Sequence, residues 1–220
     1  MILKTLILIL KTPEPAKEDA SKLRGYIGNE FKGYPILHHH IEDAGYVYTY
    51  PKVQYKIIGG TPIILGIEEG GEVLKKISDD ITELRLGNSR YKIESIQMNQ
   101  MNAEFGDCRE NYQYRFLTPW LALNPDNYQK FGEIGDWKDK KIFLNSILVG
   151  NILSMCKGLD FIVDRQLYVH SYLDETTATY KGIPHLGFMG EFRVNFKIPT
   201  FFGIGKGVSQ GFGTVTVKES

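Results

Sequence analysis

A run of three histidines, residues 38–40, is followed within ten residues by tyrosines at alternate positions, Tyr46, Tyr48 and Tyr50. The unperturbed pKa of imidazole is about 6.5, so a histidine accepts or donates a proton near neutral pH. Two such groups can act as the acid and the base of one reaction, and a phenol can orient a polar substrate by a hydrogen bond. The stretch is a candidate catalytic centre, with metal binding and an ordinary polar loop as the alternatives.

Metal binding needs more ligands than this stretch supplies at a recognisable spacing. A zinc site takes three or four ligands, so His38 and His40 would have to recruit Glu42, Asp43 or a distant residue. We therefore expect no metal site and no cofactor. The other two histidines, at positions 170 and 185, are isolated in the sequence and are expected to be structural or surface residues.

Composition limits the classes of protein that this chain can represent. Its hydrophobic fraction of 42% and charged fraction of 24% are typical of a soluble globular protein with a buried core. With 26 basic and 26 acidic residues the net charge is zero, so any RNA or DNA site must be local. The widely separated Cys108 and Cys156 indicate no disulfide scaffold, which fits a reducing cytoplasm. No stretch approaches the roughly 18 apolar residues of a membrane span.

The first half of the chain begins with a strand, a helix and a hairpin. The apolar run at residues 1–11, broken by Lys4, predicts a buried first strand rather than a signal peptide. Residues 16–31 carry apolar side chains at spacings of three and four and predict a helix, in which Gly25 and Gly28 would allow a sheet or a ligand to approach closely. Two strands then flank the turn Gly59-Gly60.

A second helix and a closing strand complete the first half. Apolar residues at helical spacing predict a helix over residues 73–84, ended by Gly87-Asn88, and Tyr91–Met98 predicts a strand. The resulting order β-α-β-β-α-β is that of a ferredoxin-like domain. Residues 1–107 are therefore expected to form an N-terminal ferredoxin-like domain that contains the candidate catalytic loop.

The second half starts in the same way. Residues 111–117 predict a strand, a loop passes through Pro119 and Pro125, and a long helix follows with Asp136 as its N-cap and Gly158 as its stop. Three more strands are expected, at residues 161–172, 187–198 and 213–217. The expected fold class is α+β, with two tandem ferredoxin-like (βαββαβ, RRM-like) domains.

A glycine-rich loop takes the place of the last helix in the second domain, residues 108–220. Glycine permits positive φ and close approach to a ligand, and the one lysine adds positive charge where a phosphate could sit. The loop is not a familiar nucleotide-binding loop, because no GKS or GKT and no following helix are present, and a tightly turning structural loop is equally consistent. Its candidate RNA-binding residues are Gly203, Gly205, Lys206, Gly207, Ser209, Gln210, Gly211 and Gly213.

The sequence pattern of this loop resembles that of a known family. Gly203-Ile204-Gly205, five residues containing a base, and Gly211-Phe212-Gly213 match the pattern glycine, hydrophobic, glycine on either side of a basic spacer. The chain thereby resembles the repeat-associated mysterious protein (RAMP) superfamily of CRISPR systems, over essentially its entire length. Within it, the chain most resembles the endoribonucleases that cut CRISPR precursor RNA at each repeat, in an archaeal-type branch with a histidine pair.

The resemblance implies a position and a chemistry for the site. The family's catalytic histidine lies in the loop after the first helix, where residues 38–40 fall. The 2′-hydroxyl of RNA attacks the adjacent phosphate without a metal ion, giving 2′,3′-cyclic phosphate and 5′-hydroxyl ends. If residues 37–41 are extended, His38 and His40 share one side and form the acid-base pair. The third consecutive histidine leaves open whether His39 serves instead.

Further roles follow from residue type within that resemblance. Tyr48 or Tyr46 would orient the scissile phosphate, although strand tyrosines more often pack against a helix. Lys52 would stabilise developing negative charge, although a lysine on a strand is more often only solvated. CRISPR repeat RNA is the expected partner, and a homodimer and association with a CRISPR effector complex are left open. The alternatives are a non-catalytic RNA-binding RAMP subunit of an interference complex and a structural ferredoxin-like module.

Overall fold

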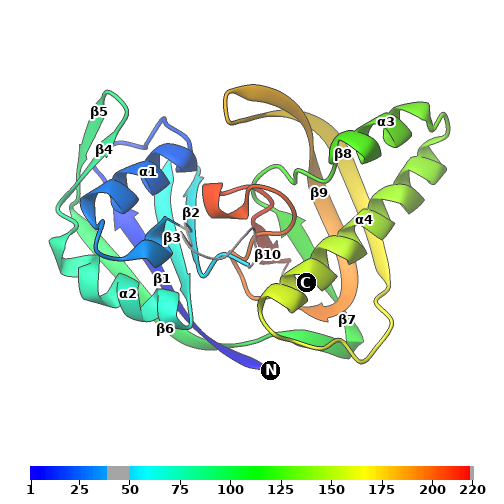
Figure 1. Cartoon of the computed structure of the whole chain (residues 1–220), viewed down its shortest axis with the longest axis horizontal. Helices are drawn as coiled ribbons and strands as arrows, with labels where there is room; N and C mark the ends of the chain where they lie inside the picture. Colours follow the sequence, from blue (N-terminus) through cyan, green and yellow to red (C-terminus); the bar gives the residue numbers. More distant parts are fainter. Residues whose placement is uncertain (39–49, 219–220) are drawn as a thin grey trace. The chain divides into compact units, whose positions relative to one another are not determined.

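The computed structural model describes residues 1–38 and 50–218. The chain divides into two compact units (Figure 1). One unit contains Ile2–Glu104 together with Val208–Gly211, the tip of the glycine-rich loop. The other contains Met1, Phe105–Gly207 and the residues from Phe212 onward. We call them the N-terminal and the C-terminal unit. No helix within the described residues is both long and apolar enough to cross a membrane.

The N-terminal unit is a four-stranded antiparallel sheet with two helices on one face. The strands, in the order β2-β3-β1-β6, give the ferredoxin-like arrangement. The elements are β1 (Ile2–Lys11), α1 (Ala20–Glu30), β2 (Val53–Ile58), β3 (Thr61–Ile67), α2 (Glu69–Ile77) and β6 (Ser95–Glu104). Apolar side chains of α1 and α2 pack on those of the strands in one core, which includes Leu8, Leu10, Leu23, Ile27, Tyr55, Ile64, Leu74 and Ile77.

Turn and cap residues account for the early boundaries. The Asp19 side chain accepts the backbone N–H of Ser21 at 2.8 Å, so α1 begins at Ala20 rather than at residue 16. Gly59 and Gly60 both have positive φ, +56° and +77°, which a two-residue hairpin turn of this kind requires. The predicted hairpin is therefore confirmed.

The helix predicted over residues 73–84 is wrong beyond Ile77. Helix α2 ends at Ile77 and is followed by a 3₁₀ turn, η2 (Ser78–Asp80), and a short hairpin, β4 (Glu83–Leu86) and β5 (Ser89–Lys92). Gly87, at φ +61°, is in the turn of this hairpin and does not end a helix. The side chains of Leu84 and Leu86, two positions apart, are both buried in the core, as on a strand. In so short a sequence this spacing cannot be distinguished from that of a helix. The strand predicted at Tyr91–Met98 covers the end of β5 and the start of the closing strand, which runs over Ser95–Glu104.

The C-terminal unit repeats the same strand arrangement, in the order β10-β7-β9-β8. Its elements are β7 (Gly106–Phe116), α3 (Pro125–Glu133), α4 (Trp137–Gly158), β8 (Val169–Tyr180), β9 (Ile183–Lys197) and β10 (Val215–Val217). A 3₁₀ turn between β9 and β10, η3 (Val208–Gln210), belongs to the N-terminal unit. The core is aromatic, with Tyr114, Phe116, Trp120, Phe188, Phe192 and Phe196 buried. The expected fold class, including the replacement of the last helix by the glycine-rich loop, is confirmed.

Two predictions for this unit need correction. The sequence predicts a loop after Pro119, but Asn124 caps a helix, α3, and Pro125 occupies its first turn, where a missing N–H is tolerated. The helix has one buried residue, Phe131, so its apolar periodicity is weak. Strand β8 covers Val169–Tyr180 and not residues 161–172. Asp136 and Gly158 bound α4 as expected.

Candidate functional site

His38 lies at the end of a short 3₁₀ turn, η1 (Pro35–Leu37), on the N-terminal unit. Its backbone N–H donates to the carbonyl of Pro35 at 3.0 Å. Its half-buried ring lies against α1 at Gly28, where a Cβ atom would come within 2.4 to 2.9 Å of three ring atoms. Gly28 therefore makes room for the imidazole of a loop residue, whereas the sequence predicts close approach of a sheet or a ligand. A Cβ atom at Gly25 would have no neighbour within 4 Å, so no described strand approaches this glycine closely.

Two side chains hold the turn that ends at His38. Arg24, on α1, donates from Nη2 to the carbonyl oxygen of His38. Tyr55, on β2, donates its hydroxyl to the carbonyl oxygen of Leu37 at 3.1 Å. Burial raises the pKa of Tyr55 far above its ordinary value, so the hydroxyl stays protonated and remains a donor. The entry to the histidine run is thus fixed from a helix and a strand at once.

The backbone of His38 differs from the extended conformation expected for residues 37–41. His38 has φ −95° and ψ −17°, which is helical rather than extended, so the alternation expected of residues 37–41 does not hold there. His39, His40, Tyr46 and Tyr48 lie outside the described residues. The selection of His40 as the partner of His38 stays a prediction.

The glycine-rich loop is tightly packed where it belongs to the C-terminal unit. Gly205 has φ +88°, and a Cβ atom there would come within 2.7 Å of the indole nitrogen of Trp120. Gly213 has φ +62°, and a Cβ atom would lie 1.9 Å from the carbonyl oxygen of Ile204. Both positions require glycine for packing alone. Lys206 is half-buried, with its Nζ 5.0 Å from the ring centre of Tyr180.

The tip of the loop lies on the two elements that hold His38. Gly211 has φ +88°, and a Cβ atom there would come within 2.8 Å of Ala20 Cβ on α1 and 2.9 Å of the Tyr55 carbonyl oxygen on β2. Ala20 is one turn before Arg24 on α1, and Tyr55 also holds the carbonyl of Leu37. Two motifs separated by about 170 residues therefore meet on the same helix and strand of the N-terminal unit.

The candidate RNA-binding residues differ in accessibility. Gly203, Gly211 and Gly213 are buried, whereas Gly205, Lys206, Gly207, Ser209 and Gln210 are half-buried. Lys52 is also half-buried, and its carbonyl oxygen accepts the N–H of Ile67 at 2.8 Å. The loop surface open to a ligand is therefore the part between Gly205 and Gln210.

Sequence reasoning missed a buried lysine on β2. Lys56 has no exposed surface, and its Nζ donates to the Gln54 side-chain oxygen at 3.1 Å. Burial lowers the pKa of Lys56 to about 7. Arg24 and Tyr55 were missed as well. A strand with Gln54 and Lys56 on alternate positions looks half-exposed in sequence, so no signal indicated this burial.

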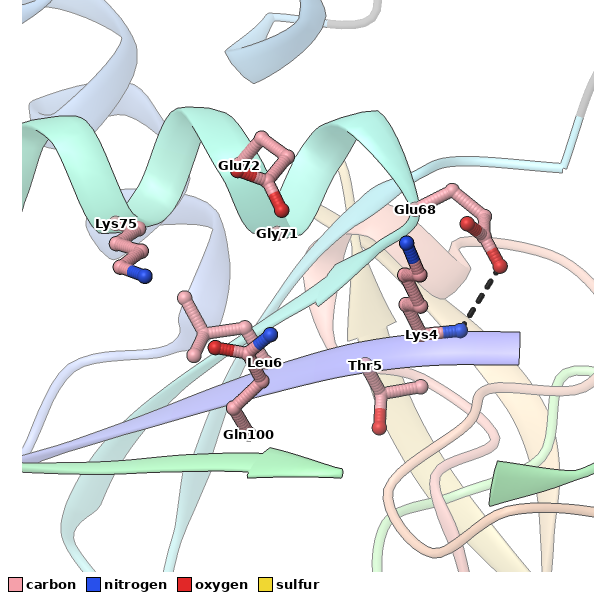
Figure 2. Close-up of a pocket in the computed structure, with 8 residues that line it drawn as sticks. All are labelled: Lys4, Thr5, Leu6, Glu68, Gly71, Glu72, Lys75 and Gln100. Atoms are coloured by element: carbon pink, nitrogen blue, oxygen red, sulfur yellow. Dashed lines mark hydrogen bonds between the residues drawn. The ribbon is translucent and has the colours of Figure 1, made fainter. Parts of the chain in front are cut away.

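A hollow beside β1 is too small to be a substrate site. The hollow lies between β1, the start of α2 and β6 (Figure 2). Its volume is about 10 Å³. This is room for about one water molecule. Glu68 accepts the N–H of Lys4 through Oε1 at 2.8 Å, and its own N–H donates to the Lys4 carbonyl at 2.9 Å. These bonds hold Glu68 at φ +50°, and the hollow is part of how α2 is attached.

No group of three or more His, Cys, Asp or Glu side chains that could hold a metal ion occurs within residues 1–38 and 50–218. The rest of the histidine run lies outside that range, so this finding concerns the described part of the site alone.

Comparison with known proteins identifies the family. The Cas6b N-terminal domain model matches residues 1–104, and the Cas6b C-terminal domain model matches residues 106–218. A protein of Methanocaldococcus jannaschii, described as uncharacterized, is 42% identical over 137 residues, 62% of this chain and 92% of its own length.

Solved structures agree. One described as the crystal structure of Cas6b is 36% identical, with a TM-score of 0.88 and coverage of 99% of this chain and 100% of its own. Another, described as CRISPR RNA processing endoribonuclease Cas6b, is 33% identical, with a TM-score of 0.79 and the same coverage. The resemblance to the CRISPR RNA-processing members of the RAMP superfamily is confirmed, and the chain belongs to the Cas6b family.

Proposed function

We propose that this protein is an endoribonuclease that cuts CRISPR repeat RNA within precursor transcripts without a metal ion. The observation that carries the proposal is the meeting of the histidine turn and the tip of the glycine-rich loop on α1 and β2. Cleavage at a phosphate requires a group that exchanges protons, and the histidine turn supplies one. The similarity to a CRISPR RNA processing endoribonuclease of the same family supports this substrate.

In the proposed reaction the 2′-hydroxyl attacks the adjacent phosphorus, and the bond to the 5′-oxygen breaks. His38 and His40 supply the base that removes the 2′-hydroxyl proton and the acid that protonates the departing oxygen. Tyr46 or Tyr48 orients the phosphate, and Lys52 stabilises its developing charge. The products are a 2′,3′-cyclic phosphate and a 5′-hydroxyl. RNA is required because DNA lacks the nucleophile.

Arg24 and Tyr55 act as positioning residues in this scheme. Neither side chain needs to touch the RNA, since each holds a backbone carbonyl of the turn that presents His38. Positioning of this kind matters because a displacement of about 1 Å can lower a rate about 100-fold. The half-buried Lys206, Ser209 and Gln210 contact the RNA backbone, while Gly203, Gly211 and Gly213 shape the loop. The proposed domains are residues 1–107, with the histidine loop, and residues 108–220, whose glycine-rich loop packs its tip, Val208–Gly211, in the N-terminal unit.

A single 2′-deoxy nucleotide tests the proposed nucleophile. The native protein is incubated with repeat RNA and with the same RNA carrying 2′-deoxyribose before the cut. We expect the substituted RNA to bind with nearly unchanged affinity and to stay intact. The 5′ ends of the native products should accept phosphate from a polynucleotide kinase without prior phosphatase treatment. Continued cutting of the deoxy substrate would exclude the 2′-hydroxyl as nucleophile.

A further inference from the structure

An exposed cluster of aromatic and basic side chains lies on the C-terminal unit, outside the glycine-rich loop. Lys141, on α4, places its Nζ 4.1 Å from the ring centre of Tyr172, on β8. The same Nζ lies 3.1 Å from Nε2 of His170, and this ring nitrogen lies 3.0 Å from the Tyr172 hydroxyl. His170 is isolated in the sequence but not in the fold.

The cluster is open to solvent because β8 is an edge strand of its sheet, with α4 running beside it (Figure 1). Side chains of β8 alternate, so that Ser171 and Leu173 are buried while His170 and Tyr172 are exposed. Tyr172 is 65% exposed. One face of its ring is covered by the lysine, and its hydroxyl is held by the imidazole. The ring is therefore fixed in place but not buried.

Further aromatic and cationic groups adjoin the cluster. Trp137 is 48% exposed and precedes Lys141 by one helical turn on α4. Tyr168, 63% exposed, directly precedes β8. Arg193, on β9, is the cross-strand neighbour of His170. Aromatic side chains interleaved with cations are the surface that single-stranded nucleic acids bind.

The acidic groups nearby are placed so that they do not cancel this charge. Glu191 is the cross-strand neighbour of Tyr172, but its carboxylate accepts Lys218 Nζ at 2.8 Å and the Gln113 side-chain amide at 2.7 Å. Lys218 and Gln113 hold the pKa of Glu191 below its usual value, so the carboxylate is charged and already paired. Asp174 follows Tyr172 by two positions on the exposed side of β8 and limits the basic patch at that end.

We propose that Lys141, His170 and Tyr172 form a stacking site for an unpaired nucleotide of the RNA substrate. The base stacks on the open face of the Tyr172 ring, and its phosphate is attracted by Lys141 and Arg193. The inference rests on the proposed function for the identity of the RNA, and assigns a contact outside the histidine turn. His170 serves to hold the ring and the lysine in register, which leaves less conformational entropy to be lost on binding.

The interactions that this cluster can make favour a nucleic acid over a protein as its partner. A base stacked on an aromatic ring improves binding about 5- to 150-fold per base. Lys141 contributes twice, through its contact with the ring and through its attraction for phosphate. Docking of a protein surface would instead favour an uncharged aromatic patch with charges at its rim.

Binding variants test the site in a His38→Ala background, in which RNA is not consumed. Affinity of fluorescein-labelled repeat RNA is measured by anisotropy over a salt series for Tyr172→Ala, Tyr172→Phe and Lys141→Ala. Tyr128→Ala is the matched control, because Tyr128 is 59% exposed on α3 and has no cation over its ring among the described residues. Thermal unfolding of each variant checks that it folds.

We expect Tyr172→Ala to bind about 5- to 150-fold more weakly and Tyr172→Phe to bind within about two-fold of the parent. Lys141→Ala should weaken binding and reduce the salt slope by about one phosphate contact. Unchanged affinity in Tyr172→Ala, or an equal loss in Tyr128→Ala, would overturn the stacking site while the parent still binds repeat RNA. Failure of the unmodified protein to bind any RNA would overturn the proposed function together with this site.

Discussion

Replacement of the buried Lys56 by methionine should stabilise the protein most at low pH. Burial lowers the pKa of Lys56 from 10.5 to about 7, a difference of about 3.5, or about 5 kcal/mol at 1.36 kcal/mol for each pH unit. The unfolded chain binds the lysine proton more tightly, so the contribution of Lys56 to the free energy of unfolding rises between about pH 7 and pH 10.5. Above pH 10.5 the buried lysine is neutral in both states and does not destabilise the fold. As the pH falls from 10.5 toward 7, the free energy of unfolding decreases by the cost of keeping Lys56 unprotonated.

Methionine fills a similar volume but cannot be protonated. Its introduction leaves the Gln54 side-chain oxygen without the Lys56 donor, which costs about 1–3 kcal/mol. The net gain in the free energy of unfolding near pH 6 is therefore about 2–4 kcal/mol, and it should disappear as the pH approaches 10.

The assay is urea unfolding followed by circular dichroism at a series of pH values from about 6 to 10. Lys92→Met is the control, because Lys92 is an exposed lysine on β5. Its stability curve should run parallel to that of the native protein. Parallel curves for Lys56→Met and the native protein would refute the assignment of this pH dependence to Lys56.

Four shorter predictions concern the site. Arg24→Ala should lower kcat for repeat RNA by about 10- to 100-fold and leave RNA affinity unchanged, with Arg24→Lys restoring part of the rate; single-turnover kinetics measure both, and equal losses in kcat and affinity would contradict a positioning role. Tyr55→Phe removes the donor to Leu37 and should lower stability by about 1–2 kcal/mol by urea unfolding, whereas an unchanged midpoint would show that this bond does not stabilise the turn. Gly211→Ala should destabilise by about 1–3 kcal/mol, because φ is +88° and the Cβ atom meets α1 and β2; a neutral effect would mean that the loop tip does not pack there. Lys206→Ala should reduce the salt slope of RNA binding by about one contact, and an identical slope would remove Lys206 from the RNA site.

Local signals predicted the fold where a residue has one physical role. Gly59-Gly60 needs positive φ, and Asp136 followed by an apolar helical pattern has one plausible interpretation, so these elements were predicted correctly. Gly87-Asn88 serves equally as a helix stop or a hairpin turn, and only the burial of Leu84 and Leu86 decides between them. The capped but polar helix α3 was missed because its apolar periodicity is weak.

The residues of the candidate site also fall into two groups, those that the sequence indicates and those that it does not. His38 and the glycine-rich loop stand out by residue type and motif. Arg24 and Tyr55 could not be predicted, because each donates one hydrogen bond to a backbone carbonyl 14 or 18 residues away. No spacing rule connects such residues, nor does any place Gly211 beside Tyr55. Tertiary contacts of this kind require the three-dimensional structure.

Metal-free cleavage that depends on His38 is the decisive measurement for the proposed mechanism. Purified native protein and His38→Ala are incubated with labelled repeat RNA in excess EDTA, with and without added imidazole, which can occupy the space that the His38 ring leaves beside Gly28. The native protein should cut at one site in the repeat, and His38→Ala should bind equally well but cut about 10²- to 10⁴-fold more slowly, with partial rescue by imidazole. Native-rate cutting by His38→Ala, or dependence of native cutting on an added metal ion, would contradict this mechanism.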